Sequence, residues 1–217
     1  MPFHLRRELD ILTQKVLSLG ARVEDSVRHS VLSLDSDNVD SAEDVVKGDI
    51  LIDQAEVELE EECLKVLALH QPVAADLRFV VAVLKINNDL ERIGDLATNI
   101  AKQSISLRSR GWEVGPFDLK YMSQLAQLML RDALNAFVSH DPSLARNVCT
   151  RDDEVDDMKR DIRVRFEKVL QEDPYRVEPL FKVLSISRNL ERIADLATNI
   201  AEDVSYMLEG KIIRHGR

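Results

Sequence analysis

The residues best suited to chemistry in this sequence are pairs of carboxylates spaced four positions apart. Glu91 and Asp95 form one pair, and Glu191 and Asp195 form an identical pair 100 positions later. Residues four apart are neighbours on one face of a helix, so each pair would place two negative charges side by side. Such a pair destabilises a helix by about 0.2–0.5 kcal/mol, and its repetition therefore requires an explanation.

A second set of acidic pairs lies upstream in each half of the chain, at the same spacing: Asp49 with Asp53, and Asp152 with Asp156. In the first half, Glu56 and Glu60 continue the acidic line along the same segment. The corresponding positions in the second half are Lys159 and Arg163. The two halves therefore carry opposite charge at these positions.

Carboxylate oxygens without histidine or cysteine partners favour hard metal cations. One hypothesis is that carboxylates from adjacent helices share a cation such as magnesium, manganese or iron. Its candidate ligands are Asp49, Asp53, Glu91, Asp95, Asp152, Asp156, Glu191 and Asp195. The other hypothesis is a solvated helix face, because Arg92 and Arg192 each lie three positions before an aspartate and could neutralise it. The spacing alone does not separate the two hypotheses.

Residue patterns typical of enzymes are not recognisable in the sequence. The five histidines show no Glu-x-x-His spacing, which di-iron proteins built on helical bundles require. We find no nucleophile–base pair and no glycine-rich phosphate loop. Cys63 and Cys149 stand alone, in no metal-binding pattern. We therefore expect a protein that is not an enzyme and that carries no organic cofactor.

The acidic pairs belong to two copies of one unit. Residues 90–101 read LERIGDLATNIA and residues 190–201 read LERIADLATNIA, with 11 of 12 positions identical. The segment from Gly48 also parallels the segment from Arg151, at an offset of 103. A duplication of this size accounts for nearly the whole chain. It predicts two similar domains, over residues 1–110 and 111–217.

Hydrophobic periodicity and helix-start signals predict three long helices in each copy, over residues 3–35, 38–69, 72–108, 117–140, 142–171 and 174–209. Pro142 and Pro174 each follow an aspartate, which is typical of a capped helix start, and we expect Pro72 to occupy the same first position. Residues 108–116 form the expected boundary between the copies. Short turns require the helices to run antiparallel, so the predicted fold is all-α, with two tandem three-helix bundles.

Several apolar stripes are expected to face the interior or a neighbouring helix. The third helix of the first copy carries Leu90, Ile93, Ala97 and Ile100 on one side. The second helix carries two heptad stripes, and these consist of Val45, Ile52, Leu59 and Val66, and of Ile50, Val57 and Leu64. Gly94 and its counterpart Ala194 belong to a strip of small residues that would allow another helix to approach closely.

Composition limits the remaining function classes. The chain has 217 residues, 45% of them hydrophobic, and a formal net charge of −10. Such a chain can bury a real core, but it repels nucleic acid and anionic lipid surfaces. We recognise no signal peptide and no apolar run that could span a membrane. We therefore expect a cytoplasmic protein without nucleic-acid binding or direct membrane insertion.

The repeated segment LERIGDLATNIA/LERIADLATNIA, with Asp76, Leu77 and Arg78 upstream in the first copy, closely resembles the signature of the PhoU family of phosphate-signalling regulators. The resemblance covers the full chain and implies tandem three-helix bundles. It also implies surface metal sites, notably for iron in some members, on the E/DxxxD motifs that coincide with the acidic pairs above. The second copy has no equivalents of Glu56 and Glu60, which argues against equal metal occupancy of the two copies.

The resemblance further implies a non-enzymatic negative regulator of phosphate uptake and phosphate-starvation signalling. Such a protein would link a phosphate ABC transporter to a sensor histidine kinase when phosphate is plentiful. We expect these two partners, and we include a homodimer among the expected assemblies. The alternative is a metal-dependent enzyme or a metal store on a helical scaffold. Acidic stripes that face outward without a histidine partner favour the adaptor.

Overall fold

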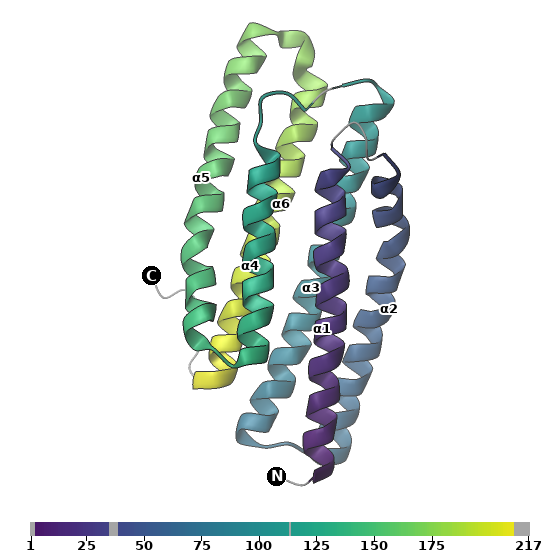
Figure 1. Cartoon of the computed structure of the whole chain (residues 1–217), viewed down its shortest axis with the longest axis vertical. Coiled ribbons are helices and arrows are strands. Elements are labelled where there is room, and N and C mark those ends of the chain that lie inside the picture. The colour runs from purple at the N-terminus through teal and green to yellow at the C-terminus, as the bar shows by residue number, and fades with distance from the viewer. Residues whose placement is uncertain (1–2, 35–38, 113, 211–217) are drawn as a thin grey trace.

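The computed structural model describes residues 3–34, 39–112 and 114–210, and helices occupy most of them (Figure 1). The helices are α1 (Phe3–Leu32), α2 (Val39–His70), α3 (Ala74–Ser109), α4 (Leu119–Ser139), α5 (Pro142–Glu172) and α6 (Val177–Glu209). A 3-10 turn over Pro174–Arg176 precedes α6, and the described residues contain no strand. The predicted all-α class is confirmed. The expected break at residues 35–38 lies outside the described residues.

The predicted helix starts agree with the structure at α5 but not at α3. The Asp141 carboxylate accepts hydrogen bonds from the backbone N–H groups of Ser143 at 2.8 Å and Leu144 at 3.2 Å, which confirms the capped start of α5. The prediction for Pro72 is wrong, because α3 begins at Ala74. Val73 is extended, with φ −126° and ψ 158°, and three residues, Gln71 to Val73, connect α2 to α3 before the helix starts.

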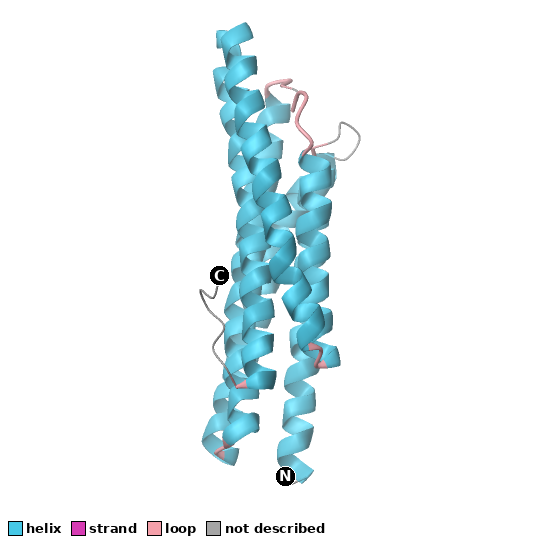
Figure 2. Cartoon of the chain, turned by 90° about the vertical axis from the view of Figure 1, so that its left-hand side faces the viewer, coloured by secondary structure: helices cyan, strands magenta, loops and turns pink. Residues whose placement is uncertain are grey.

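The six helices form two three-helix bundles that lie side by side (Figure 1). Helices α1, α2 and α3 pack together, as do α4, α5 and α6, and the two bundles meet where α3 contacts α6 and α1 contacts α4. Helices α3 and α6 run in opposite directions. Within the described residues, α2 and α5 contact only their own bundle and form its outer side. All helices follow the long axis, and the described loops gather at the ends (Figure 2).

A single apolar core continues through both bundles. The predicted stripe of α3 is fully buried, as is the α2 stripe that contains Ile52 and Leu59. The second α2 stripe is not part of the core, because the exposed fractions of Ile50, Val57 and Leu64 are 59%, 50% and 53%. Among the described residues, no helix combines the length and the apolarity needed to cross a bilayer.

The strip of small residues on α3 faces α2, as predicted. A Cβ atom added to Gly94 would lie 3.1 Å from both Cδ1 and Cγ2 of Ile52, closer than ordinary van der Waals contact. In the second repeat the matching positions are Ala194 and Val155. Repeat one thus pairs glycine with the larger isoleucine at this contact, whereas repeat two pairs alanine with the smaller valine.

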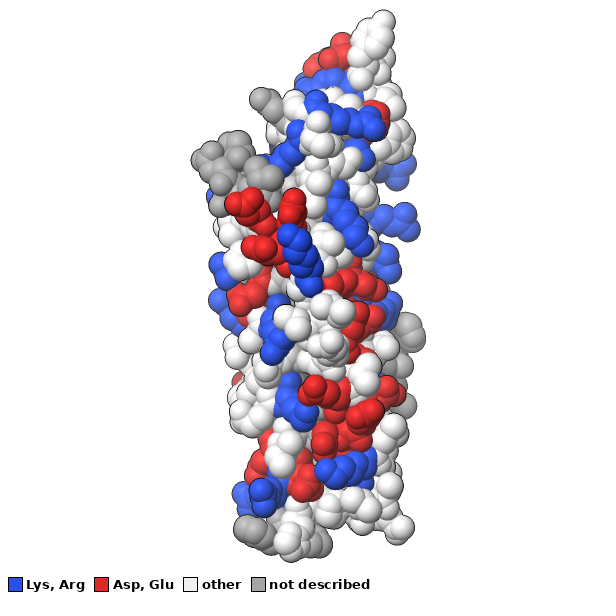
Figure 3. Space-filling view, turned by 90° about the vertical axis from the view of Figure 1, so that its right-hand side faces the viewer, with Lys and Arg blue, Asp and Glu red and all other residues white. Residues whose placement is uncertain are grey.

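The two ends of the molecule differ in charge. Residues 159–188, at the α5–α6 end, include eight Lys or Arg and five Asp or Glu, whereas residues 56–88, at the α2–α3 end, include three and six. These two ends point in opposite directions along the long axis (Figure 1). On the face seen in Figure 3, Lys and Arg predominate near the upper end, and Asp and Glu predominate below it.

Candidate functional site

The structure brings the four predicted carboxylates of repeat one together where α2 packs on α3. Asp49 and Asp53 come from α2, and Glu91 and Asp95 come from α3. Asp53 and Asp95 are exposed, whereas Asp49 and Glu91 are half-buried at the base of the cluster. The four-residue spacing keeps each pair on one side of its helix. The expectation that the acidic stripes face outward holds for Asp53 and Asp95 but not for the half-buried Asp49 and Glu91.

Burial and mutual repulsion both act on this cluster. Burial raises the pKa of Asp49, and the charges of Asp53 and Asp95 raise it further, although Lys102 opposes them in part. The pKa of Glu91 is raised by burial first and then by the neighbouring acids, chiefly Asp95. These directions reflect burial first and then repulsion among the four carboxylates.

Repeat two brings its four carboxylates together in the same way. Asp152 lies on α5, and burial, followed by the charges of Asp195 and Asp156, raises its pKa to about 6. The pKa of Asp195 is also raised, by burial and then by Glu191 and Asp156, although Lys159 lowers it in part. The predicted grouping of acidic side chains by helix pairing therefore holds in both repeats.

Lys159 makes the cluster of repeat two chemically different from that of repeat one. Its Nζ donates to Glu191 Oε1 at 2.5 Å, so repeat two holds a cation of its own. The matching residue of repeat one is Glu56, whose carboxylate accepts a hydrogen bond from Asn87 Nδ2 at 3.1 Å. The sequence shows the substitution, but the contact with Glu191 depends on the packing of α5 against α6.

The arginine proposed as a partner for Asp95 points elsewhere. Arg92 lies 3.2 Å from Asp89 Oδ1, on the side of α3 that faces α6. Asp95 forms no ion pair with any residue that the structure describes. The solvated-face hypothesis therefore loses its expected ion pair in repeat one, because the arginine turns toward a different carboxylate on its own helix.

The donor chemistry of repeat one fits a hard cation, since its four carboxylates supply oxygen ligands and Lys102 offsets the charge at Asp49 only in part. Across residues 3–34, 39–112 and 114–210, no group of three or more His, Cys, Asp or Glu side chains is arranged so that it could hold a metal ion. Cation binding would require rotation of exposed side chains such as Asp53 and Asp95. The eight metal ligands stay a prediction.

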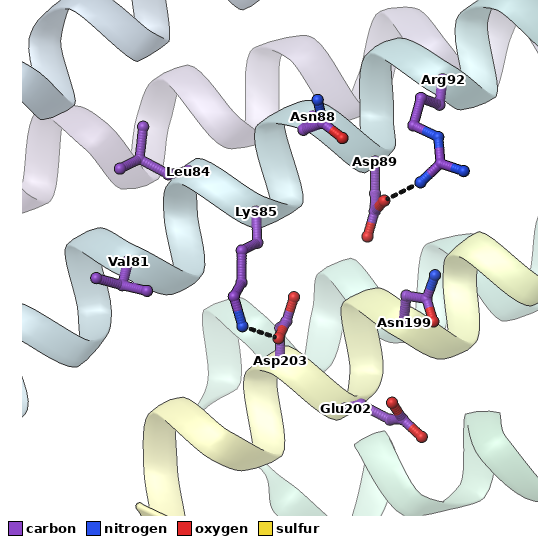
Figure 4. A pocket seen from close by; sticks show the side chains of 9 residues that line it. All are labelled: Val81, Leu84, Lys85, Asn88, Asp89, Arg92, Asn199, Glu202 and Asp203. Atoms are coloured by element: carbon purple, nitrogen blue, oxygen red, sulfur yellow. Dashed lines mark hydrogen bonds and ion pairs between the residues drawn. The ribbon is translucent and has the colours of Figure 1, made fainter. Parts of the chain in front are cut away.

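A second polar site, missed by sequence reasoning, lies in a groove of about 540 Å³ between α3 and α6 (Figure 4). Lys85 Nζ from α3 meets Asp203 Oδ1 from α6 at 2.8 Å, and the Asp203 side chain is only 4% exposed. The Arg92–Asp89 pair lies farther along the same groove. A contact between positions 118 apart leaves no local signal in the sequence. Both cations of the groove are paired, and the Lys85–Asp203 contact ties the two repeats together.

The family follows from a comparison with known proteins. The PhoU domain model matches residues 16–104 and again residues 119–204, which together span most of the chain. The chain belongs to the PhoU family. Each matched PhoU segment contains one complete cluster of four carboxylates.

Curated relatives extend the match along the whole chain. A phosphate-specific transport system accessory protein PhoU homolog of Aquifex aeolicus is 35% identical and covers 97% of this chain and 96% of its own length. A homolog of the same name from Rhizobium meliloti is 33% identical over 94% of this chain and 86% of its own length. These names describe accessory proteins, and PhoU is a non-enzymatic family.

Solved structures confirm the fold. PhoU from Pseudomonas aeruginosa superimposes with a TM-score of 0.91 at 34% identity, covering 95% of this chain and 99% of that one. The phosphate transport system regulatory protein PhoU from Streptococcus pneumoniae gives 0.88 at 31%, covering 96% and 98%. Two tandem three-helix bundles are therefore the PhoU architecture, and the predicted fold class is confirmed.

Proposed function

We propose that this chain is a cytoplasmic accessory protein of a phosphate-specific transport system, which lowers phosphate uptake and phosphate-starvation signalling when phosphate is plentiful. It would act as an adaptor between the phosphate ABC transporter and a sensor histidine kinase. The observation that carries the proposal is the match of both PhoU domains, over nearly full length, to proteins named accessory or regulatory. No covalent chemistry is needed for such a role.

The shape of the molecule supports an adaptor. Its elongated body offers long helix faces, and its two ends differ in charge, so two unlike partners could bind without overlapping (Figure 1). The polar groove between the repeats has its cations paired with Asp89 and Asp203. These features favour protein contacts over binding of a substrate that must be transformed.

Deletion of the gene tests the regulatory role. Expression of phosphate-starvation genes and phosphate uptake would be measured in rich phosphate, with and without the gene supplied in trans. We expect both to rise in the deletion strain and to return on complementation. Repression that persists without the gene, together with failure to recover the transporter or the kinase with the purified protein, would refute the proposal. Sedimentation of the same preparation would show whether the protein is the expected homodimer.

The metal sites form the second part of the proposal. In repeat one, Glu91 and Asp95 with Asp49 and Asp53 would hold iron, manganese or magnesium, which would neutralise the cluster. The proposal is supported by the raised pKa values of Asp49 and Glu91, because a cation relieves the repulsion that contributes to them. The residues bind and orient the cation, and no reaction is assigned to it.

Metal analysis of the variant Glu91→Ala with Asp95→Ala checks this part. After equal loading with manganese and gel filtration, the variant should retain less metal than the unmodified protein, with an unchanged helical circular dichroism spectrum. Equal metal content would support the other hypothesis, in which these carboxylates form a solvated helix face. Many ions per chain would favour the alternative of a metal store.

A further inference from the structure

The α5–α6 hairpin contains a groove that no part of the proposed function explains. Its volume is about 800 Å³, and it runs from Asp156, at the edge of the acidic cluster of repeat two, toward the basic end. Arginine and aromatic side chains share its lining, notably Arg163, Arg188, Phe166 and Phe181. The rings of Phe166 and Phe181 meet edge to face, with centroids 5.5 Å apart. Phe181 is nevertheless 59% exposed, so one side of its ring stays open to a ligand.

Two guanidinium groups of the groove are available to a ligand. Arg163 Nε lies 3.6 Å from Glu167 Oε1, a long contact between two exposed side chains. Arg188 is exposed and has no ion pair with any residue in the described ranges. The other cations of the groove are engaged, Lys159 with Glu191 and Arg160 with Asp157. An anionic group that bridged Arg163 and Arg188 would therefore have to replace only the long Arg163–Glu167 contact.

The duplication shows that the fold does not require these residues. The position of Arg163 is Glu60 in repeat one, Arg188 is Asn88, and Phe181 is Val81. The same α-hairpin thus folds with an acidic, non-aromatic surface at the α2–α3 end. A side chain that neither packing nor capping demands, and that adds exposed apolar area, needs another explanation.

We propose that this groove receives an acidic segment of a partner protein, which carries an apolar side chain that packs on Phe181. Arginine forks bind carboxylates in two-pronged geometry, and arginine and aromatic residues often dominate protein interfaces. Asp156 and Glu167 also line the groove, so its net charge is too small for a surface of many phosphates such as a membrane. The inference rests on the proposed function, because the partner it assigns is the phosphate transporter.

Variants that copy repeat one test the inference. Arg163→Glu with Arg188→Asn removes the guanidinium groups, and Phe181→Val removes the ring; all three positions are exposed, so folding should be unaffected. The control is Arg7→Glu with Arg22→Asn, which changes the net charge equally on exposed positions of α1. The probe is the purified phosphate-transport complex in phosphatidylcholine nanodiscs, with binding measured by interferometry and folding checked by circular dichroism.

We expect each groove variant to bind the complex at least tenfold more weakly, while the control stays within twofold of the unmodified chain. Unchanged binding of the groove variants overturns the inference and leaves the proposed function intact. Failure of the unmodified protein to bind the complex overturns both. Empty phosphatidylglycerol nanodiscs provide a lipid arm. Binding to them that the groove variants lose would assign the groove to lipid and overturn the inference.

Discussion

At the scale of single residues, a lysine in repeat two does what a bound cation would have to do in repeat one. Lys159 contacts Glu191 at 2.5 Å and lowers the pKa of Asp195 in part. Its counterpart Glu56 adds negative charge instead, and its own pKa is raised by burial and then by Glu60 and Asp53. The two clusters therefore differ in how much of their charge a neighbouring lysine balances, although their four carboxylates match.

Lys159→Glu, which restores the residue found in repeat one, should create a better cation site in repeat two. In the Glu91→Ala, Asp95→Ala background, so that repeat one contributes little, we expect manganese affinity to rise at least tenfold, or about 1.4 kcal/mol. Titration followed by electron paramagnetic resonance measures it. Lys168→Glu, an exposed change elsewhere on α5, is the control. Equal affinities for the two variants would show that Lys159 does not compete with metal.

Asp152 makes repeat two sensitive to pH. Its pKa is about 6 in the folded chain and near 3.8 when unfolded, so the folded state binds more protons between these values. The free energy of unfolding therefore falls as pH rises from about 4 to 6 and stays lower above that range. This cost is absent at low pH, where the carboxyl group is protonated in both states.

Asp152→Asn should remove that cost. With chelator present, we expect the variant to be more stable than the unmodified chain at pH 7.5 by about 1 kcal/mol, a value reduced because solvent screens a half-exposed group. At pH 4 the two should unfold at the same denaturant concentration. The exposed change Asp161→Asn, farther along α5, serves as the control and should change little. Equal stability at pH 7.5 would contradict the raised pKa.

At the scale of helices, the contact of α2 with α3 depends on matched volumes. Gly94 gives Ile52 room in repeat one, whereas Ala194 stands opposite the smaller Val155 in repeat two. An alanine in a helix interior is favoured over glycine by about 0.5–1 kcal/mol, but here its Cβ would press on Ile52. Propensity and packing therefore oppose each other at this position.

The pair can be transplanted between repeats. We expect Gly94→Ala alone to be neutral or destabilising, and Gly94→Ala to become stabilising when Ile52→Val is also present. A double-mutant cycle in urea should give a favourable coupling of about 0.5–1 kcal/mol between the two changes. Additive effects would mean that the backbone moves freely enough to absorb the methyl group.

The helices show which structural features can be predicted from local sequence and which cannot. The start of α5 followed from Asp141 and Pro142, since a cap is a local feature. The start of α3 did not follow from Pro72, because the conformation of the preceding turn decides how many residues it uses. Periodicity alone could not tell the buried α2 stripe from the exposed one at Val57, since both repeat every seven residues. The Lys85–Asp203 contact could not be predicted from the sequence, because it depends on how the two repeats pack together.

At the scale of the whole molecule, stability resides in the continuous apolar core. That core runs through both bundles without any metal ligand in it. Folding energy should therefore come from apolar burial and not from metal, unlike a zinc finger, which is unfolded without its ion. The acidic clusters lie at the surface of this core and add to stability only when a cation is bound.

Chelation should accordingly lower the melting temperature by only a few degrees. We expect helical circular dichroism at 25 °C to be unchanged in excess chelator, because the apo chain keeps its whole core. Heating scans with manganese and with chelator provide the measurement, and the Glu91→Ala, Asp95→Ala variant should show a smaller difference between them. Loss of helical signal on chelation would show that the metal is structural.

The unlike charge of the two ends has a kinetic consequence. A helix such as α6, with 33 residues, is about 50 Å long, so the opposite charges sit far apart and form a dipole. Near a charged partner, the field exerts a torque that turns the complementary end forward before contact. Because the screening length is about 10 Å at 0.1 M salt, this torque acts only in the last stage of approach. Ionic strength should thus alter the association rate constant of a partner more than its dissociation rate constant.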